Sequence, residues 1–396
     1  MKPLIDVDVQ ICHDLEMALR REWIITNGRA GYASSTVPGC NTRKYHGLLI
    51  ATPENPSDRK LYLAGLEETL ELGGKEYNLS TIHGPDGFHP MGNEHIVNLR
   101  LEPFPIITFA AGDWEIEKRI FMQAQRNTVV IRYRVVYGEG KGTLNIVPLV
   151  TCRGINEVQN DHNALSGEFN TPGHGEIVWH YGNHCTPLRL FHNAADVKKF
   201  ENEKRKLKYP VEEERGYESD DVVTRLCRLN FSLTKTDPAH IIGTLEDRYP
   251  GNAISLERDE LRRRRVVMNK IPDINPDPKE EHVLQNLFNS AESFLARKRT
   301  RLSIIAGYPW FGEWGRDSMI SLPGLLLETG KFEETRNYLL SILKYYRKGL
   351  IPNCFPDADE SPVYNSLDAS LWFVNAAYQY YRYTGDDDTI RMPLYD

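Results

Sequence analysis

The period of the apolar residues changes once along the chain, near residue 256. Before that point, short segments alternate apolar and polar side chains, and Ile131, Tyr133 and Val135 with the arginines between them are the clearest example. A period of two is typical of half-buried β-strands. After that point, apolar residues recur every three or four positions, as in 280–299, which is the period of an amphipathic helix. The sequence therefore predicts a β part followed by a helical part.

Several other segments before residue 256 are short, apolar and bordered by turn residues. They are KYHGLLIATP, KLYLAGLEETLELGG, FPIITFAAG, HGEIVWHYG and VVTRLCRLNFSL. After the strand at 131–135, the glycines of GEGKG (138–142) predict a hairpin turn into the next strand. The charged stretch 196–221 is expected to leave the sheets as a helical insert or a loop. Together these features predict antiparallel sheets packed face to face as a β-sandwich.

The second part of the chain contains at least four helical patterns. They cover 280–299, 318–330, 331–349 and 368–385, and a fifth begins near 386. Asp317 and Asp368 are plausible N-caps of two of these helices, and Pro323 should bend one of them. The connection after residue 330 is short, whereas 350–367 has no helical pattern. Alternating short and long connections between antiparallel helices place the long loops at one end, where we expect a binding site.

These patterns predict a multi-domain β + α protein. We expect an N-terminal β-sandwich domain at 1–255, a linker at 256–280 and the helices of a second domain at 281–396. The basic run at 262–265 is interpreted as a solvated helix face or part of the linker, because acidic residues lie beside it.

Composition excludes several classes of protein. The net charge of −7 argues against a general nucleic-acid or membrane-surface binder. No apolar run approaches the roughly 18 residues of a membrane-spanning helix, and the N-terminus lacks a signal-peptide core. The six cysteines have no paired spacing, so we expect reduced thiols in a cytoplasmic protein. The segment HGEIVWHYGNHC fits no zinc template, and no metal site is expected.

Aromatic, acidic and amide residues gather in the two long loops of the helical part. The candidate substrate-binding residues are Trp310, Trp314, Arg316, Asp317, Tyr364, Asn365 and Asp368. Aromatic rings can stack on the apolar face of a pyranose, while carboxylates and amides can bind its hydroxyl groups. Arg316 beside Asp317 could hold that carboxylate ionised and oriented. This combination is typical of a sugar-binding site.

Structural interpretations compete with this one. Asp317 and Asp368 could be N-caps only, with Asp317 paired to Arg316. Trp310 and Trp314 could belong to the core, and Trp372 is expected there because it lies inside a helix. The remaining loop acids are expected to be solvated; they are Glu313, Asp357, Asp359 and Glu360. Two helices that each begin with an acid after an aromatic-rich loop still favour a binding site.

Two long motifs resemble a known family. The sequence from GYPWFGEWGRDSMISLPG to NCFPD (307–357), followed by YNSLDASLWFVNAAYQYYRYTGD, resembles the amylo-α-1,6-glucosidase region of glycogen debranching enzymes. The N-terminal EWIITNGRAGYASSTVPGCNTRKYHGLLIA (22–51) resembles the N-terminal domain of the prokaryotic enzymes. Related WGRD motifs occur in glucoamylases and trehalases, but the motifs here are longer and more specific.

The resemblance implies a β-sandwich followed by a barrel of six helical hairpins, (α/α)6. It implies a hydrolase that removes α-1,6-linked glucose at the branch points of glycogen or a branched α-glucan, with inversion and without a metal or other cofactor. Trp314, Arg316 and Asp317 would line the pocket for the terminal glucose, and the next long loop would supply Tyr364, Asn365 and Asp368. The N-terminal motif is expected to be mainly structural, although one of four residues could reach the barrel: Arg43, Lys44, Tyr45 or His46.

The sequence departs from the family pattern by ending after about five of twelve helices. We therefore expect an incomplete (α/α)6 barrel in an N-terminal fragment. The Thr-Trp-Met-Asp type motif that carries the family's general acid does not occur, and an inverting glycosidase needs two separated carboxyl groups. The chain alone is expected to be inactive, with Asp317 and Asp368 as the fallback catalytic candidates. The alternatives are a glucoamylase, trehalase or sugar phosphorylase on the same scaffold, or a non-catalytic carbohydrate-binding protein.

Overall fold

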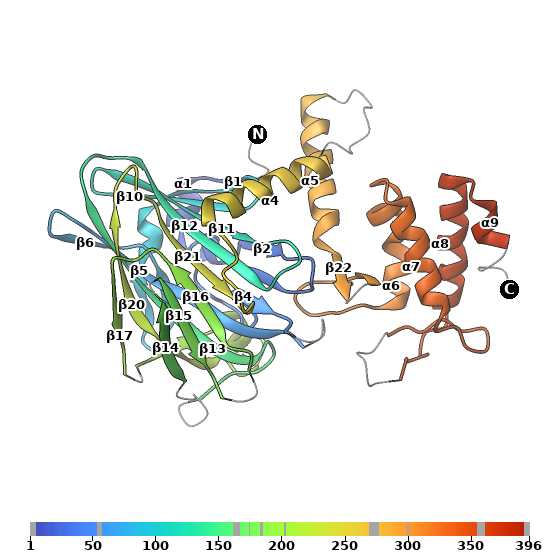
Figure 1. Ribbon diagram of the computed structural model, residues 1–396, viewed down its shortest axis with the longest axis horizontal. Helices are drawn as coiled ribbons and strands as arrows, with labels where there is room; N and C mark the ends of the chain where they lie inside the picture. Colours follow the sequence, from blue (N-terminus) through green and yellow to red (C-terminus); the bar gives the residue numbers. More distant parts are fainter. Residues whose placement is uncertain are drawn as a thin grey trace. The chain divides into compact units, whose positions relative to one another are not determined.

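The computed structural model describes residues 5–53, 58–160, 167–173, 175–182, 185–201, 203–268, 277–298, 301–354 and 361–391 (Figure 1). These residues form two compact units. The first lies within 5–261, and the second consists of 262–391 together with 28–30. In the described part of the chain, no helix is long and apolar enough to cross a membrane.

Two large antiparallel sheets make up most of the first unit. The nine-stranded sheet has the spatial order β1 (Ile5–Val7), β9 (Ile96–Leu101), β10 (Pro105–Ala111), β11 (Trp114–Met122), β12 (Thr128–Tyr137), β21 (Ala239–Thr244), β16 (Leu188–His192), β15 (Glu176–His180) and β14 (Glu168–Gly173). The ten-stranded sheet has the order β17 (Asp196–Lys199), β20 (Cys227–Leu233), β13 (Gly142–Gly154), β5 (Lys60–Leu72), β4 (Gly47–Ala51), β3 (Tyr32–Thr36) and β2 (Glu22–Thr26). Three further strands flank it: β6 (Lys75–Asn78), β18 (Lys204–Lys208) and β19 (Asp220–Arg225).

Both sheets contribute to one hydrophobic core. Ile131 and Ile242 of the nine-stranded sheet and Leu49 and Ile146 of the ten-stranded sheet are fully buried in the same cluster. Side chains on β12 alternate as predicted, since Ile131 is buried and Arg134 is exposed. The expected antiparallel sheets, packed face to face, are therefore confirmed.

Short elements complete the first unit. They are α1 (Val9–His13), α2 (Leu15–Leu19), the 3-10 helix η1 (Gly92–His95), α3 (Pro210–Glu214) and the two-stranded sheet of β7 (Thr81–Gly84) and β8 (Gly87–Met91).

The predicted hairpin at GEGKG is wrong. β12 pairs with β11 and β21, whereas β13 pairs with β5, β19 and β20 of the other sheet. Gly138 and Gly140 have φ angles of 119° and 90°, so the glycines do form a tight turn. This turn carries the chain from one sheet to the other. The prediction failed because turn residues indicate where a chain reverses but not which strand it pairs with next.

The charged stretch 196–221 was also predicted wrongly as an excursion from the sheets. Its residues form β17, β18 and α3, and β18 pairs with β19 in the ten-stranded sheet. Edge strands often carry charged side chains that face water. The high charge of this stretch therefore led to its interpretation as a loop or insert instead of strands. The segment at 222–233 was expected as one strand but is divided between β19 and β20.

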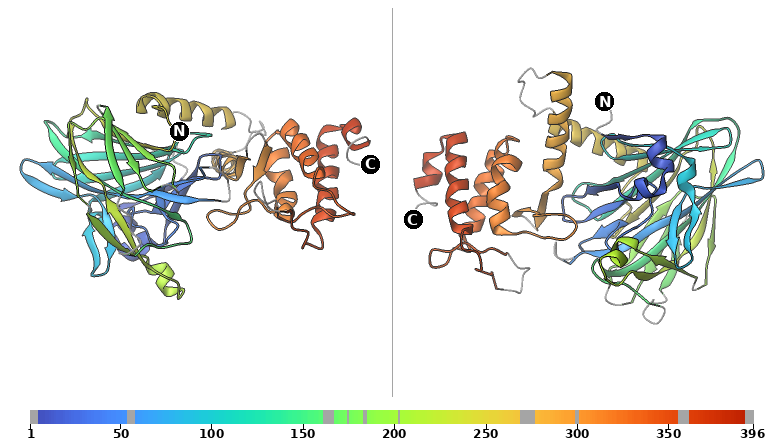
Figure 2. Two further views of the ribbon diagram at one scale, coloured as in Figure 1. Left: turned by 60° about the horizontal axis from the view of Figure 1, so that its bottom comes forward. Right: turned by 180° about the vertical axis from the view of Figure 1, so that it is seen from behind.

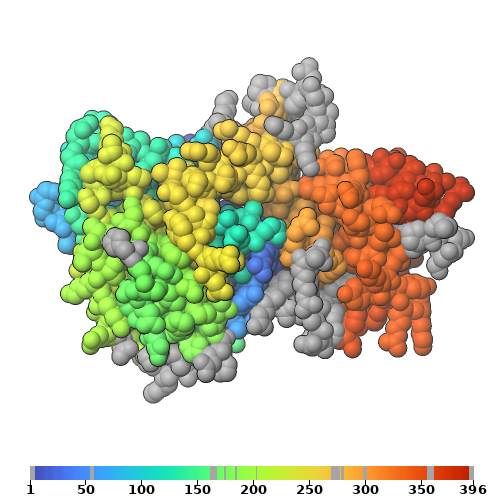
Figure 3. Space-filling view, viewed as in Figure 1, coloured from blue at the N-terminus to red at the C-terminus, as the bar shows by residue number. Residues whose placement is uncertain are grey.

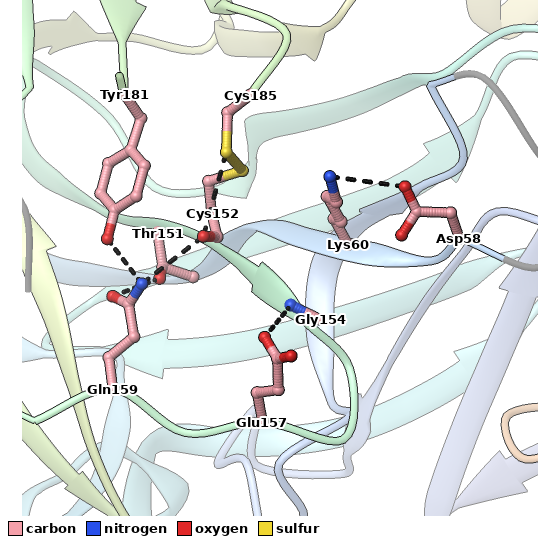
Figure 4. The surroundings of a disulfide bond; sticks show 9 residues. All are labelled: Asp58, Lys60, Thr151, Cys152, Gly154, Glu157, Gln159, Tyr181 and Cys185. Carbon is pink, nitrogen blue, oxygen red and sulfur yellow. Dashed lines mark hydrogen bonds and ion pairs between the residues drawn. A yellow bond between two sulfur atoms is a disulfide. The ribbon is translucent and has the colours of Figure 1, made fainter. Parts of the chain in front are cut away.

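The expectation that all six cysteines are reduced is wrong. Cys152 on β13 and Cys185, which precedes β16, form a disulfide with their Cα atoms 6.5 Å apart (Figure 4). The bond joins segments of the two sheets that are 33 residues apart in sequence, so their spacing gave no signal. The other cysteines are thiols, and burial raises the pKa of Cys12 to about 11 and the pKa values of Cys40 and Cys227 to about 12.

The second unit is mainly helical and is seen from two further sides in Figure 2. After α4 (Ala253–Met268), its elements are α5 (Pro278–Ser293), β22 (Leu295–Lys298), β23 (Arg301–Ile304), α6 (Gly315–Leu322), the π-helical turn η2 (Pro323–Leu327), α7 (Phe332–Leu343), α8 (Ala369–Thr384) and α9 (Asp387–Thr389). Pro323 ends α6, as its missing N–H requires. Apolar residues of α6, η2, α7 and α8 form one core, which includes Met319, Leu339 and Phe373.

Two predictions for this region need correction. The stretch 256–280 was expected to be a linker, but α4 occupies its first half, and α4 lies on the face shown in Figure 3. Arg262 and Arg265 are exposed on it, as expected for a solvated helix face, but Arg264 is buried and donates to Oδ1 of Asn289 at 2.9 Å. The helix predicted at 280–299 ends at Ser293, and the next residues pair with β23 instead. The incomplete (α/α)6 barrel stays a prediction.

Candidate functional site

The two long loops of the second unit lie together at the N-terminal ends of α6 and α8. Trp314 and Cys354 form an antiparallel bridge, and Cys354 bridges to Val363. The Gly315 N–H also donates to the carbonyl of Asn353 at 2.7 Å. These backbone contacts fix the loop before α8 against the start of α6, so both loops present their side chains at the same end of the helices.

Arg316 joins the starts of the two helices. Its Nε lies 2.9 Å from Oδ1 and 3.0 Å from Oδ2 of Asp368. Asp368 also accepts hydrogen bonds from Ser366 Oγ and Trp372 Nε1, each at 3.1 Å. The hydrogen bond from Arg316 is the main cause that lowers the pKa of Asp368. Asp368 is therefore held ionised and oriented, which suits it to bind rather than to donate protons.

Asp317 is placed differently from the prediction. Arg316 pairs with Asp368 and not with Asp317, and the N-cap position of α6 is occupied by Trp314. Asp317 lies in the first turn of α6 and is exposed. Among the described residues, its carboxylate has no hydrogen-bond or ion-pair partner, and Arg316 is its neighbouring cation. An ionised carboxylate near a helix N-terminus is favoured by the helix dipole, so both of its oxygens can accept hydrogen bonds from a ligand.

Aromatic rings are exposed in the loop that precedes α6. Trp310 is 55% and Phe311 is 49% exposed, so the core interpretation is wrong for Trp310. Phe311 packs edge-to-face on the partly buried Trp314, with ring centres 6.4 Å apart. Exposed rings of this size are costly in water and are typical of binding surfaces.

Tyr364 and Asn365 belong to the loop before α8. The Tyr364 hydroxyl donates to the carbonyl of Tyr345 at 2.6 Å, and Asn353 Nδ2 donates to Oδ1 of Asn365 at 3.1 Å. The Tyr364 hydroxyl and the Asn365 carbonyl oxygen therefore hold the loop. Asn365 is an exposed residue, and its amide nitrogen could still donate to a ligand.

Glu313 is not the solvated loop acid that the sequence predicted. It is 8% exposed, and Arg301 donates to both of its carboxylate oxygens, with Nη1 2.6 Å from Oε1. The Tyr338 hydroxyl donates to the same carboxylate at 3.0 Å. Burial, followed by the Glu313 charge, raises the pKa of Tyr338 well above its usual value. Glu313 therefore anchors the aromatic loop to β23 and α7.

Trp372 was expected in the core; it is partly buried against the core of the second unit, and its indole N–H also donates to Asp368. The i, i+4 spacing on one helix face could have indicated this contact. The loop acids Asp357, Asp359 and Glu360 lie outside the described residues. Within the described ranges, no group of three or more His, Cys, Asp and Glu side chains is arranged to hold a metal ion; His174 and His184 fall outside those ranges.

Apart from residues 28–30, the N-terminal motif is built into the first unit. Arg43 Nε donates to Glu22 at 2.6 Å, and Nε2 of the buried His46 lies 3.5 Å from the other Glu22 oxygen. Burial by itself would raise the pKa of Glu22, but the contacts with His46 and Arg43 lower it to about 2. Tyr45 is buried, and the Lys44 ammonium lies 5.4 Å from the centre of a tyrosine ring. These contacts support the mainly structural interpretation of the motif.

Comparison with known proteins identifies the family. The family described as "Glycogen debranching enzyme N terminal" matches residues 21–240, which is more than half of the chain, and "Amylo-alpha-1,6-glucosidase" matches residues 289–395. The chain belongs to the glycogen debranching enzyme family. It is 40% identical over 106 residues to a glycogen debranching enzyme of Saccharomyces cerevisiae, a match that covers 24% of this chain and 7% of the yeast enzyme.

A solved structure shares the fold. A bacterial glucoamylase, in complex with acarbose, has a TM-score of 0.53 and 12% sequence identity, and the match covers 99% of this chain and 57% of the glucoamylase chain. The chain thus spans about half of the glucoamylase and a small part of the yeast enzyme.

Proposed function

We propose that this protein acts as a glycoside hydrolase on glucans and removes α-1,6-linked glucose at the branch points of glycogen, with inversion. The pairing of Arg316 with Asp368 carries the proposal. It brings together residues 52 positions apart and leaves the carboxylate of Asp317 exposed beside them. Family membership supports the choice of a branched α-glucan as the substrate.

The site would bind the terminal glucose through two kinds of contact. Trp310 and Trp314 offer ring surfaces for the apolar face of the sugar. Asp317 accepts hydrogen bonds from two hydroxyl groups, and the exposed amide of Asn365 can donate to another. Asp368, fixed by Arg316, keeps a second charged acceptor in place. Charge-assisted hydrogen bonds are the strongest of these contacts.

Inverting hydrolysis also needs a general acid and a general base on opposite sides of the scissile bond, roughly 6.5–9.5 Å apart. Asp368 is unsuited to act as the acid, because Arg316 lowers its pKa. Asp317 is exposed beside Arg316, and we assign both carboxylates to substrate binding.

The test uses the longer enzyme of which this chain is expected to be the N-terminal part, and replaces Asp317 with asparagine, which keeps the size of the side chain and removes its charge. We expect kcat/KM for glucose release from a branched limit dextrin to fall by roughly 10- to 100-fold, since each charge-assisted hydrogen bond is worth about 1.5–3 kcal/mol. Asp388→Asn, at an exposed position of α9, is the matched control and should change activity by less than about twofold.

Binding of maltose measured by calorimetry gives a second readout that does not need turnover. Asp317→Asn should weaken maltose binding and Asp388→Asn should not. If Asp317→Asn and Asp388→Asn have the same kcat/KM and the same affinity for maltose, then Asp317 does not belong to a glucose subsite. Release of glucose from linear α-1,4 glucans at the same rate as from branched ones would instead contradict the debranching reaction.

A further inference from the structure

A second cavity lies in the helical unit, between the β22–β23 hairpin and α7. Its volume is about 550 Å³, and the residues that line it include Arg297, Glu334, Asn337, Ser341, Lys344 and Tyr345. Small-molecule sites typically have roughly 300–1,000 Å³. None of the seven residues assigned to the glucose subsite lines this cavity, although the Tyr364 hydroxyl donates to the carbonyl of Tyr345, which does.

The charges around this cavity favour an anion. Arg297 and Lys344 are both exposed, and in the described part of the chain neither side chain has a hydrogen bond or an ion pair. Arg301 also lines the cavity, but its guanidinium is already neutralised by Glu313. Glu334 is the single carboxylate among the lining residues. These two cations are suited to bind a phosphate group. The Lys344 ammonium would act as a point charge, and the Arg297 guanidinium would donate two parallel hydrogen bonds.

The other lining groups favour a ligand that also carries hydroxyl groups. Asn337 presents an exposed amide, which can both donate and accept. Ser341 Oγ donates its proton to the carbonyl of Tyr338 at 2.7 Å, so its lone pairs remain to accept a hydrogen bond. Tyr345 is 37% exposed and offers part of a ring face to a sugar.

We propose that this cavity binds a small phosphorylated sugar. The phosphate would lie between Arg297 and Lys344, and the sugar hydroxyl groups would meet Asn337 and Ser341. A neutral sugar would leave the two cations uncompensated, and a metal cation would be repelled by them. The proposal concerns a site apart from the glucose subsite and does not depend on the hydrolysis proposed above.

The experiment measures binding of glucose 6-phosphate, inorganic phosphate and glucose to the whole chain by calorimetry at constant ionic strength. We expect saturable binding of glucose 6-phosphate, with inorganic phosphate at least several-fold weaker. Arg297→Gln and Lys344→Gln should each weaken the binding of glucose 6-phosphate by about tenfold. Lys348→Gln removes an equal charge from an exposed position outside the cavity lining and should have an effect below about twofold.

Glu334→Gln separates loss of binding from loss of folding. It removes the one carboxylate that repels the phosphate, so the affinity for glucose 6-phosphate should rise by a fewfold while that for glucose does not. The absence of saturable binding, equal losses in Lys344→Gln and Lys348→Gln, or equal affinities for glucose 6-phosphate and inorganic phosphate would each overturn the proposal. Failure of the Asp317→Asn test would leave these results unaffected, because the two sites share no assigned residue.

Discussion

Replacing Glu313 with glutamine would test how the aromatic loop is held. Glu313 directly precedes Trp314, and its carboxylate is bound by two nitrogens of Arg301 and by the hydroxyl of Tyr338. The Glu313 and Arg301 side chains are 5% and 18% exposed, so the pair is shielded from water. Glutamine has nearly the same shape, and the substitution therefore removes a charge with little change in packing.

The expected cost follows from that burial. Removing one partner of a buried ion pair costs about 3–5 kcal/mol, because the other charge is left uncompensated. The glutamine oxygen can still accept one hydrogen bond from Arg301 or Tyr338, which places the expected loss near 3 kcal/mol, the lower end of that range. A loss of this size is a large part of the roughly 5–15 kcal/mol that stabilises a typical domain.

The assay should resolve the two units, because a chain with two compact units need not unfold in one step. Hydrogen exchange followed by mass spectrometry reports the opening free energy of each segment. We expect faster exchange in peptides that cover α7 and the loop up to Trp314, and no change in the β-sheets. Glu333→Gln, at an exposed position of α7, is the control and should cost less than about 1 kcal/mol.

Adding Arg301→Gln to Glu313→Gln should cost less than the sum of the single changes, since the stranded charge disappears. If Glu313→Gln costs no more than Glu333→Gln, then the buried pair does not anchor this loop and our account of the site's support is wrong.

The remaining predictions concern the first unit and the thiols. The pKa of Glu22 is lowered from 4.5 to about 2 in the folded protein, so the stabilisation from its contacts with His46 and Arg43 is present above about pH 4.5 and is lost as the pH falls toward 2. The stability advantage of the unmodified protein over Glu22→Gln, measured by urea unfolding, should shrink in that window, and a difference independent of pH would contradict the assignment. Four cysteines should be alkylated after unfolding without a reductant and all six after reduction; six without reduction would exclude the Cys152–Cys185 bond. In the folded protein Cys354 should react first, because burial raises the pKa of the other three thiols.

Local patterns in the sequence were enough to predict the two halves of the protein. The period of two at 131–135 and the helical period after residue 256 depend only on neighbouring residues, and both appear in the structure. The segments WGRD and NSLD were found as the residues that begin two helices after aromatic-rich loops. Such features are determined by spacing along the chain, because strand and helix geometry repeat over a few residues.

Pairings between distant residues were decided by the tertiary structure. The partner of Arg316 is Asp368 and not the adjacent Asp317, and Cys152 meets Cys185 although 33 residues separate them. The turn at GEGKG was visible in the sequence, but the sheet that the chain enters after it was not.

Glu313 shows the physical reason most clearly. An acidic residue in a loop is usually solvated, yet Glu313 is buried because β23 supplies Arg301 and α7 supplies Tyr338. A charge can be buried only where partners from other elements surround it. The sequence by itself determined which side chains could carry the chemistry, and the packing of separate elements decided which of them meet.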